Sequence, residues 1–277
     1  MYDTRGGDRR CTCDLFYDRL NTQQRSEQIS ILDQLTANKP ANYARMLCVH
    51  GGQGVGKTTF GAGCPQPALL PIEMGYRDID FPMVFPLQTS FMQLYGTVMQ
   101  LDAEESLPFK TLVIDSADWV EALIEQQLDD ENFKRDYGRG VAEVGARFKT
   151  FLDALRHLNR KHNVMIVILS HSRLAKVELP TGGSYDQWQP KLSKKANEYL
   201  VEAVDEVGFA HHETIVRKEN SGFKDRGVGV TTGRRMLSLT PSAAYVAKNR
   251  ARQGVQVPEN VELNFESYLE LFYKKGE

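Results

Sequence analysis

Short apolar runs alternate with amphipathic segments through most of this chain. Continuous apolar runs bounded by polar or glycine-containing stretches are typical of strands that are buried on both faces. Such runs predict strands at residues 46–49, 68–73, 83–85, 111–115 and 164–169, the last being the most apolar and the expected central strand. Elsewhere, apolar residues at helical spacing predict helices at residues 90–101, 117–128, 141–159 and 194–203. Strands alternating with helices predict an α/β fold with a mostly parallel, doubly wound sheet.

The pattern changes after residue 170. Residues 172–192 contain several prolines and glycines and are predicted to form a long loop. Short strands are predicted beyond it, with the glycine-rich residues 222–233 joining two of them as a C-terminal antiparallel hairpin extension. These short strands lie at residues 207–210, 214–216, 236–239 and 244–247.

The same pattern divides the chain into three parts. Residues 1–43 are predicted to be an N-terminal extension with one helix at residues 22–37. Residues 44–255 contain the alternating strands and helices and form the expected core. Residues 256–277 are predicted to be a C-terminal helical tail.

The turn after the first strand carries a phosphate-binding pattern, because Gly51 to Thr58 fit G-x-x-x-x-G-K-[ST] at every fixed position. Glycines let the backbone curl so that N–H groups point inward and form an anion-binding nest, with the next helix beginning beside it. The Lys57 ammonium can reach the β- and γ-phosphates, and the Thr58 hydroxyl can ligate Mg²⁺. The pattern predicts a nucleoside-triphosphate site made of Gly51, Gly52, Gln53, Gly54, Val55, Gly56, Lys57, Thr58 and Thr59.

An acidic residue ends the predicted strand at residues 111–115. Asp115 can hold Mg²⁺ together with Thr58, which is the role of the Walker B aspartate in phosphate-loop NTPases. Asp115 also precedes a predicted helix, so an N-cap is the alternative role for its carboxylate, although Ser116 can fill that position instead.

Two more polar residues end or follow predicted strands. Glu73 can face the γ-phosphate, where a carboxylate orients or deprotonates the attacking water. His171 can touch the γ-phosphate and report its loss to the following loop. A surface acid at a strand end and a hydrogen-bonded histidine are the respective alternatives.

Bulk charge does not indicate a nucleic-acid ligand, because the formal net charge is −2. Basic groups interleaved with aromatic side chains nevertheless suit single strands, whose phosphates attract cations and whose bases stack on rings. Residues 131–140 and 172–195 have this character and provide the predicted DNA-binding residues Lys134, Arg135, Arg139, Arg173, Lys176, Tyr185, Trp188, Lys191 and Lys194. The basic stretch at residues 217–235 is a third candidate. A solvated basic loop is the alternative for each.

Two cations follow the last predicted short strand. Lys248 and Arg250 can act across a subunit interface, where they would stabilise charge on the γ-phosphate held by a neighbouring subunit. A charged strand end is the alternative interpretation.

Composition narrows the class of protein. The chain has 277 residues, of which 41% are hydrophobic and 25% charged, as is ordinary for a globular protein. No apolar run approaches the length of a membrane span, and the charged N-terminus lacks the apolar core of a secretory signal. Four cysteines without a disulfide pattern make a reducing cytoplasm the expected compartment.

Several segments together resemble a known family. GGQGVGKTT, TLVIDS, GRGVAEVGARFKTFLDALRHLNRKHNVMIVILSHS, GSYDQWQPKLSKKANEYL and AYVAKNR resemble the phage RecA-like nucleotide-binding ATPases, which include the Sak-type single-strand-annealing proteins. The resemblance covers roughly residues 44–255. It implies a RecA-like P-loop NTPase core, ATP with Mg²⁺, single-stranded DNA binding, and a role in phage annealing or recombination inside the host cell.

The resemblance also implies roles for individual residues. Lys57 and Thr58 match the phosphate-loop ligands and Asp115 the Mg²⁺ acid, while Glu73 resembles the catalytic glutamate and His171 the γ-phosphate sensor. The segments at residues 131–140 and 172–192 resemble DNA-binding loops. Lys248 and Arg250 resemble the basic pair that reaches a neighbouring subunit's ATP.

Two other functions remain open at this point. The chain can be a nucleotide-gated accessory protein that acts through a phage single-strand-binding or replication protein and turns over little or no ATP. A small-molecule kinase shares the phosphate loop, but the sequence shows no lid-like arginine cluster. The leading hypothesis is a homo-oligomeric ATPase with ATP at subunit interfaces and single-stranded DNA as its partner.

Overall fold

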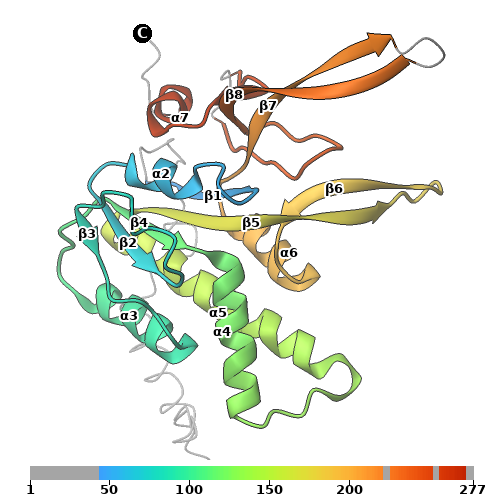
Figure 1. Ribbon diagram of the computed structural model, residues 1–277. Helices are drawn as coiled ribbons and strands as arrows, with labels where there is room; N and C mark the ends of the chain where they lie inside the picture. The colour runs from blue at the N-terminus through green and yellow to red at the C-terminus, as the bar shows by residue number, and fades with distance from the viewer. Residues whose placement is uncertain (1–43, 221–224, 252–255, 273–277) are drawn as a thin grey trace, which may run out of the picture. The chain divides into compact units, whose positions relative to one another are not determined.

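The computed structural model describes residues 44–220, 225–251 and 256–272 (Figure 1). The predicted N-terminal extension at residues 1–43, including the helix at residues 22–37, lies outside these ranges. Among the helices in the described ranges, none is both long enough and apolar enough to cross a bilayer.

The centre of the described structure is a sheet of parallel strands. In spatial order these are β3 (Met83–Val84), β2 (Pro67–Pro71), β4 (Thr111–Asp115), β5 (Met165–Glu178), β1 (Met46–Gly51) and β7 (Glu206–Asn220). The inner half of β5 pairs with both β4 and β1, which confirms the prediction of a central strand there. Because β1 and β4 run parallel, their carboxyl ends meet at one edge of the sheet.

Antiparallel strands extend the sheet. β8 (Asp225–Ser238) pairs with β7 as a long hairpin, which confirms the predicted C-terminal hairpin extension, and β9 (Asn260–Glu262) pairs with β8. The strands predicted at residues 207–210 and 214–216 are parts of one continuous β7, with an irregularity between His212 and Thr214. The strand predicted at residues 236–239 is the end of β8. The strand predicted at residues 244–247 is wrong, because only an isolated bridge from Tyr245 to Trp188 forms there. Both the β5–β6 and β7–β8 hairpins reach beyond the parallel part of the sheet (Figure 1).

The prediction of a long loop at residues 172–192 is wrong. The outer half of β5 pairs antiparallel with β6 (Ser184–Pro190), from Ser172 opposite Pro190 to Glu178 opposite Ser184. Exposed and partly buried positions alternate from Leu174 to Glu178 and from Ser184 to Gln189, which suits a ribbon with two unlike faces. The residues that indicated a loop lie at the two ends of β6. Pro180, Gly182 and Gly183 lie at the turn of the hairpin, where both glycines take positive φ, and Pro190 is the last residue of β6.

Helices cover both faces of the sheet, as the doubly wound prediction requires. One apolar core lies under α3 (Phe91–Ala103), α4 (Ala117–Asp130), α5 (Arg139–His162) and α6 (Lys194–Ala203). A second core lies under α2 (Lys57–Ala62) and α7 (Phe265–Phe272) on the opposite face. The result is a mixed α/β fold with a mostly parallel central sheet, consistent with a P-loop NTPase core.

Residues 256–272, within the segment predicted as a C-terminal helical tail, pack on the rest of this fold. The helix itself is correctly predicted, but Phe265, Tyr268 and Phe272 of α7 are buried in the second core. Tyr268 packs edge-on against Phe60 of α2 with ring centroids 6.3 Å apart. The sequence pattern of α7 is amphipathic because one face packs on the core and the other faces solvent.

Candidate functional site

The loop between β1 and α2 lies at the carboxyl edge of the sheet. Gly54 and Gly56 take positive φ values of 72° and 105°. A residue with a Cβ adopts such backbone angles only under strain. A methyl group on the Gly51 Cα would lie 2.3 Å from the carbonyl oxygen of Ala210 on β7. Gly54 and Gly56 are therefore required by the curl of the loop, and Gly51 by the close approach of β7.

Lys57 is folded into the loop. Its Nζ donates to the carbonyl oxygens of Gly51 at 3.1 Å and Gly52 at 2.9 Å, and the residue is only 7% exposed. Burial lowers the pKa of Lys57, while the carboxylates of Asp115 and Asp118 act in the opposite direction. The ammonium lies where phosphate oxygens can replace the two carbonyls as its partners.

Thr58 and Asp115 converge from α2 and the end of β4. The Thr58 hydroxyl donates to Asp115 Oδ2 at 2.8 Å. Burial raises the pKa of Asp115 to about 6, although the bond from Thr58 lowers it. The helix α4 begins with Ser116 as its N-cap residue, so Asp115 does not fill the capping position that was its alternative role.

The Thr58 hydroxyl and the Asp115 carboxylate fit the ligand chemistry of Mg²⁺. This ion prefers hard oxygen donors and is usually bound by few protein groups together with phosphates. Among the described residues, no three His, Cys, Asp or Glu side chains gather as a metal site. Thr58 and Asp115 are therefore the groups that would hold Mg²⁺, with the remaining ligands coming from the nucleotide and water.

Glu73 lies beside Asp115, just past the end of β2. Its backbone N–H donates to the Asp115 carbonyl at 3.4 Å, and its side chain accepts a hydrogen bond from Trp119 Nε1 at 2.8 Å. Pro71 is the last residue of β2 and pairs with Asp115. The structure therefore brings Glu73 to the phosphate-loop edge, as predicted.

His171 is held by a carboxylate that the sequence pattern did not indicate. His171 lies beside Gly51 in the β5–β1 register. Asp118 Oδ2 is 2.9 Å from His171 Nδ1, and Asp118 Oδ1 accepts the His171 backbone N–H at 3.0 Å. Burial raises the pKa of Asp118 but the hydrogen bonds from His171 outweigh it, so the net shift is downward. Asp118 lies in the first turn of α4, three residues after Asp115, and this position was its only signal in the sequence.

His50 links the phosphate-loop strand to two other segments. Its Nε2 is 2.8 Å from the carbonyl of Val246, and its Nδ1 is 2.8 Å from the hydroxyl of Ser172. Since a carbonyl only accepts, Nε2 carries the proton and Nδ1 accepts from Ser172. Burial lowers the pKa of His50 to about 4, so it is neutral near pH 7.

The predicted DNA-binding residues of the β5–β6 hairpin lie on two faces. Partners across an antiparallel ladder share a face, so Trp188, Leu174 and Lys176 lie on one face. Arg173 and Tyr185 lie on the other. The remaining two residues of this set, Lys191 and Lys194, are exposed near the start of α6.

The Trp188 face continues onto β7. Trp188 stacks on Phe209 with centroids 6.4 Å apart, and Phe209 stacks on Tyr245 at 4.9 Å and on His211 at 5.3 Å. Trp188 remains 41% exposed. The sequence did not indicate Phe209 or Tyr245 as site residues, because only the β6–β7 arrangement aligns their rings.

Of the basic loop predicted at residues 131–140, residues 131–138 lie between α4 and α5, away from the phosphate loop, and Arg139 is the first residue of α5 (Figure 1). Arg135 is engaged within it, since its guanidinium donates to the Glu125 carbonyl at 2.8 Å and to Asp129 at 2.7 Å. Arg139 lies over the Phe133 ring at 6.0 Å. Lys134 is exposed. The structure thus gives Arg135 a role in holding the loop.

Lys248 and Arg250 do not reach the phosphate loop of their own chain. Lys248 Nζ donates to the carbonyls of Val201 and Val204, where α6 ends, at 2.6 and 2.7 Å. Arg250 is 3.3 Å from Asp205, next to the amino end of β7 and therefore at the opposite edge of the sheet. A role for Arg250 across an interface stays a prediction, whereas the Lys248 ammonium is committed to capping α6.

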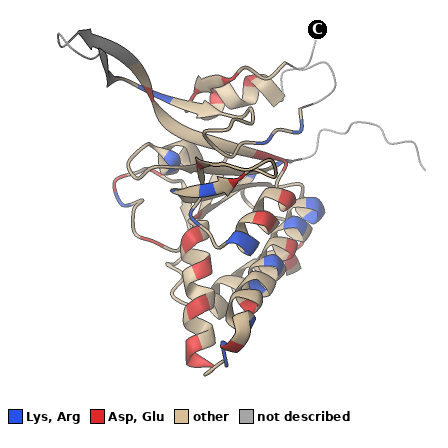
Figure 2. Ribbon diagram, turned by 90° about the vertical axis from the view of Figure 1, so that its right-hand side faces the viewer, with Lys and Arg blue, Asp and Glu red and all other residues tan. Residues whose placement is uncertain are grey.

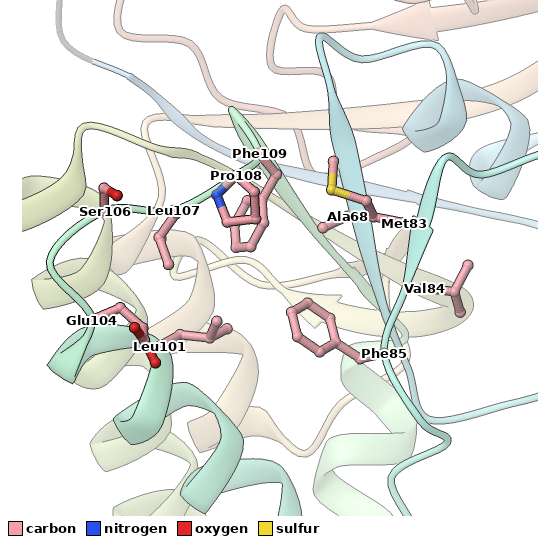
Figure 3. Close-up of a pocket in the computed structure, with 10 residues that line it drawn as sticks. All are labelled: Ala68, Met83, Val84, Phe85, Leu101, Glu104, Ser106, Leu107, Pro108 and Phe109. Carbon is pink, nitrogen blue, oxygen red and sulfur yellow. The ribbon is translucent and has the colours of Figure 1, made fainter.

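A separate cavity of about 360 Å³ lies at the β3 edge of the sheet. Its lining is mainly apolar, with Met83, Phe85, Leu107 and Phe109 around it (Figure 3). None of the predicted site residues lines this cavity, so it is distinct from the phosphate-loop site.

The comparison with protein families agrees with this geometry. A family described as AAA domain matches residues 44–251, which span the phosphate loop, Asp115, His171 and Arg250. A search of the curated proteins finds no match.

Proposed function

The chain belongs to the AAA-domain family, and from this premise we propose that it is an ATPase that binds single-stranded DNA and assists phage DNA annealing or recombination. The family match makes it a P-loop nucleotide-binding ATPase in general. The observation that carries the ATPase part of the proposal is the convergence of Lys57, the Thr58–Asp115 pair and Glu73 at one edge of the sheet.

Each group at this edge has a chemical task in ATP hydrolysis. Lys57 exchanges its two carbonyl partners for β- and γ-phosphate oxygens. Thr58 and Asp115 would hold Mg²⁺, and the bound ion would supply positive charge beside the phosphates. Glu73 accepts the proton of the attacking water while Trp119 fixes its carboxylate. His171 and Asp118 are the pair placed to respond to loss of the γ-phosphate.

Single-stranded DNA binding is supported by the β5–β6 hairpin. Its outer half joins directly to His171, so the segment next to the site continues into the hairpin. Trp188 offers an exposed ring, backed by Phe209 and Tyr245, and Lys176 lies on the same face. A ring for bases and a cation for phosphates are the two components that single strands require.

An oligomer with ATP at its interfaces is supported by the position of Arg250. This side chain is 53% exposed and lies at the edge of the sheet opposite the phosphate loop. A head-to-tail arrangement of subunits would bring that edge against the neighbour's phosphate loop. Along α5 basic and acidic positions are interleaved, whereas α4 carries acidic positions and no Lys or Arg (Figure 2).

Binding of a labelled oligothymidylate, measured by fluorescence anisotropy in low salt with a non-hydrolysable ATP analogue, tests the DNA assignment. We expect Trp188→Ala to weaken binding about tenfold, because one base–ring stack is lost, and Trp188→Phe to retain most of it. Lys176→Ala should also weaken binding. Lys149→Ala is the control, because Lys149 lies on α5 and pairs with Asp153.

The outcome also separates the alternative function. If the wild-type protein binds no single strand under these conditions, the DNA proposal is wrong. A nucleotide-gated accessory protein that acts through a replication partner then becomes the better description. If Trp188→Ala binds DNA as the wild type does, the hairpin is not the binding surface.

A further inference from the structure

Arg235 of β8 lies against the phosphate loop. A methyl group built on the Gly56 Cα would be 2.8 Å from Arg235 Nη1, 3.5 Å from its Cδ and 3.7 Å from its Cζ. The guanidinium therefore rests directly on the last glycine of the loop, one residue before Lys57. A side chain at position 56 would displace it, in addition to straining the positive φ.

The root of this side chain is fixed. Arg235 pairs with His212 across the β7–β8 ladder, and its carbonyl accepts the Leu263 N–H at 2.9 Å on its other side. Its tip is different, because in the described part of the chain no hydrogen-bond or ion-pair partner is found for the guanidinium. The residue is exposed. A fixed backbone with an unpaired cation at its tip is suited to meeting an anion.

The preceding arginine provides the contrast. Arg234 points to the other face of β8, as alternation along a strand requires, and pairs with Glu262 at 3.2 Å. Of these two adjacent arginines, only the one that faces the phosphate loop lacks an acidic partner among the described residues. Guanidinium groups bind phosphate oxygens with two parallel hydrogen bonds, so phosphate is the expected anion.

We infer that Arg235 contacts the phosphate chain of a nucleoside triphosphate bound in the loop of its own chain, and that this contact connects the β7–β8 hairpin to the nucleotide. The inference rests on the proposed ATP site and adds a second cation to Lys57. Because Arg235 belongs to the hairpin, gain or loss of phosphate changes a contact at the base of that hairpin.

Direct binding of fluorescent ATP and AMP analogues by the full-length protein, without turnover, tests this inference. Arg235→Ala should lower ATP affinity about tenfold, as expected for loss of a charge-assisted hydrogen bond. The loss should be smaller for AMP, which offers fewer phosphate oxygens. Arg234→Ala, the matched control, should leave ATP affinity unchanged, and Arg235→Lys should retain part of it.

The outcomes are distinguishable. If the wild type binds no ATP, the proposed site itself fails. If the wild type binds ATP and Arg235→Ala binds it equally well or more tightly, only this inference is overturned, and Arg235 covers the empty loop instead. Equal losses for Arg234→Ala and Arg235→Ala would also overturn it. If Arg235→Ala has a lower melting temperature than the wild type, Arg235→Gln, which keeps most of the length of the side chain, gives the same comparison.

Discussion

The indole Nε1 of Trp119 donates a hydrogen bond to Glu73 Oε2 at 2.8 Å. This bond joins the first turn of α4 to the end of β2, across the edge where β2 and β4 lie side by side. It restricts the carboxylate that we propose as the base for hydrolysis. Trp119 is thus a positioning residue, since it acts through Glu73 and not on the nucleotide.

Replacing Trp119 by phenylalanine keeps a ring but removes the donor. We expect the turnover number for ATP to fall about tenfold, because a base held in poor geometry loses part of its contribution. ATP affinity should remain unchanged. The Trp119→Phe, Glu73→Gln double variant should be no slower than Glu73→Gln alone. An additional loss in the double variant would show that Trp119 does not act through Glu73.

Replacing Lys57 by alanine removes the ammonium that is bonded to the Gly51 and Gly52 carbonyls. ATP affinity should fall by about a hundredfold, because more than one charge-assisted bond to phosphate is lost. Isothermal titration calorimetry measures this directly. Lys149→Ala, which alters an exposed pair on α5, should bind ATP as the wild type does; unaltered binding by Lys57→Ala would place the nucleotide elsewhere.

His50 predicts a specific dependence of stability on pH. Burial lowers its pKa from 6.5 to about 4, so between these values the unfolded chain binds a proton that the folded chain does not. The stabilisation from neutral His50 is complete above pH 6.5 and is lost as the pH falls toward 4. The full effect is on the order of 3 kcal/mol.

Urea unfolding of the wild type and His50→Gln at several pH values isolates this effect. Because the glutamine does not titrate, the free energy of unfolding of His50→Gln should rise relative to that of the wild type as the pH falls from 7 to 4. A constant difference in the free energy of unfolding across this range would mean that His50 is not the titrating group. Comparing two variants at each pH cancels the opposite contribution of Asp115, whose pKa is raised.

The interface role of Arg250 is tested by mixing. Arg250→Ala should bind ATP normally but hydrolyse it slowly, and Lys57→Ala should not bind it. In a mixed oligomer, the phosphate loop of the first variant meets the intact Arg250 of the second. Hydrolysis by the mixture above the sum of the two separate variants is expected; hydrolysis equal to that sum contradicts the interface role.

Local sequence patterns predicted the parts of the fold and site that depend on neighbouring residues. The apolar run ending at Asp115 matches β4 residue by residue, and the loop from Gly51 to Thr58 lies between a strand and a helix as its motif requires. Such features need only buried strands and a glycine-rich turn. They were therefore sufficient to predict the strands of the sheet core and the position of the phosphate loop.

Partnerships between distant segments were beyond the sequence. The pairing of His171 with Asp118 and of Glu73 with Trp119 joins separate elements. Lys248 is another example. The sequence indicated an interface role for it, but its ammonium donates to carbonyls at the end of α6, a contact that depends on the fold. The β5–β6 hairpin was missed for a local reason: its prolines and glycines are typical of a loop, and its two segments lack a strict alternation of polar and apolar residues.

Steady-state ATP hydrolysis in the presence of Mg²⁺, with and without single-stranded DNA, tests the central claim most directly. We predict that the wild type hydrolyses ATP, that single-stranded DNA raises the rate, and that Lys57→Ala shows neither activity. Hydrolysis that persists in Lys57→Ala, or a wild-type rate that single-stranded DNA leaves unchanged, would contradict the account.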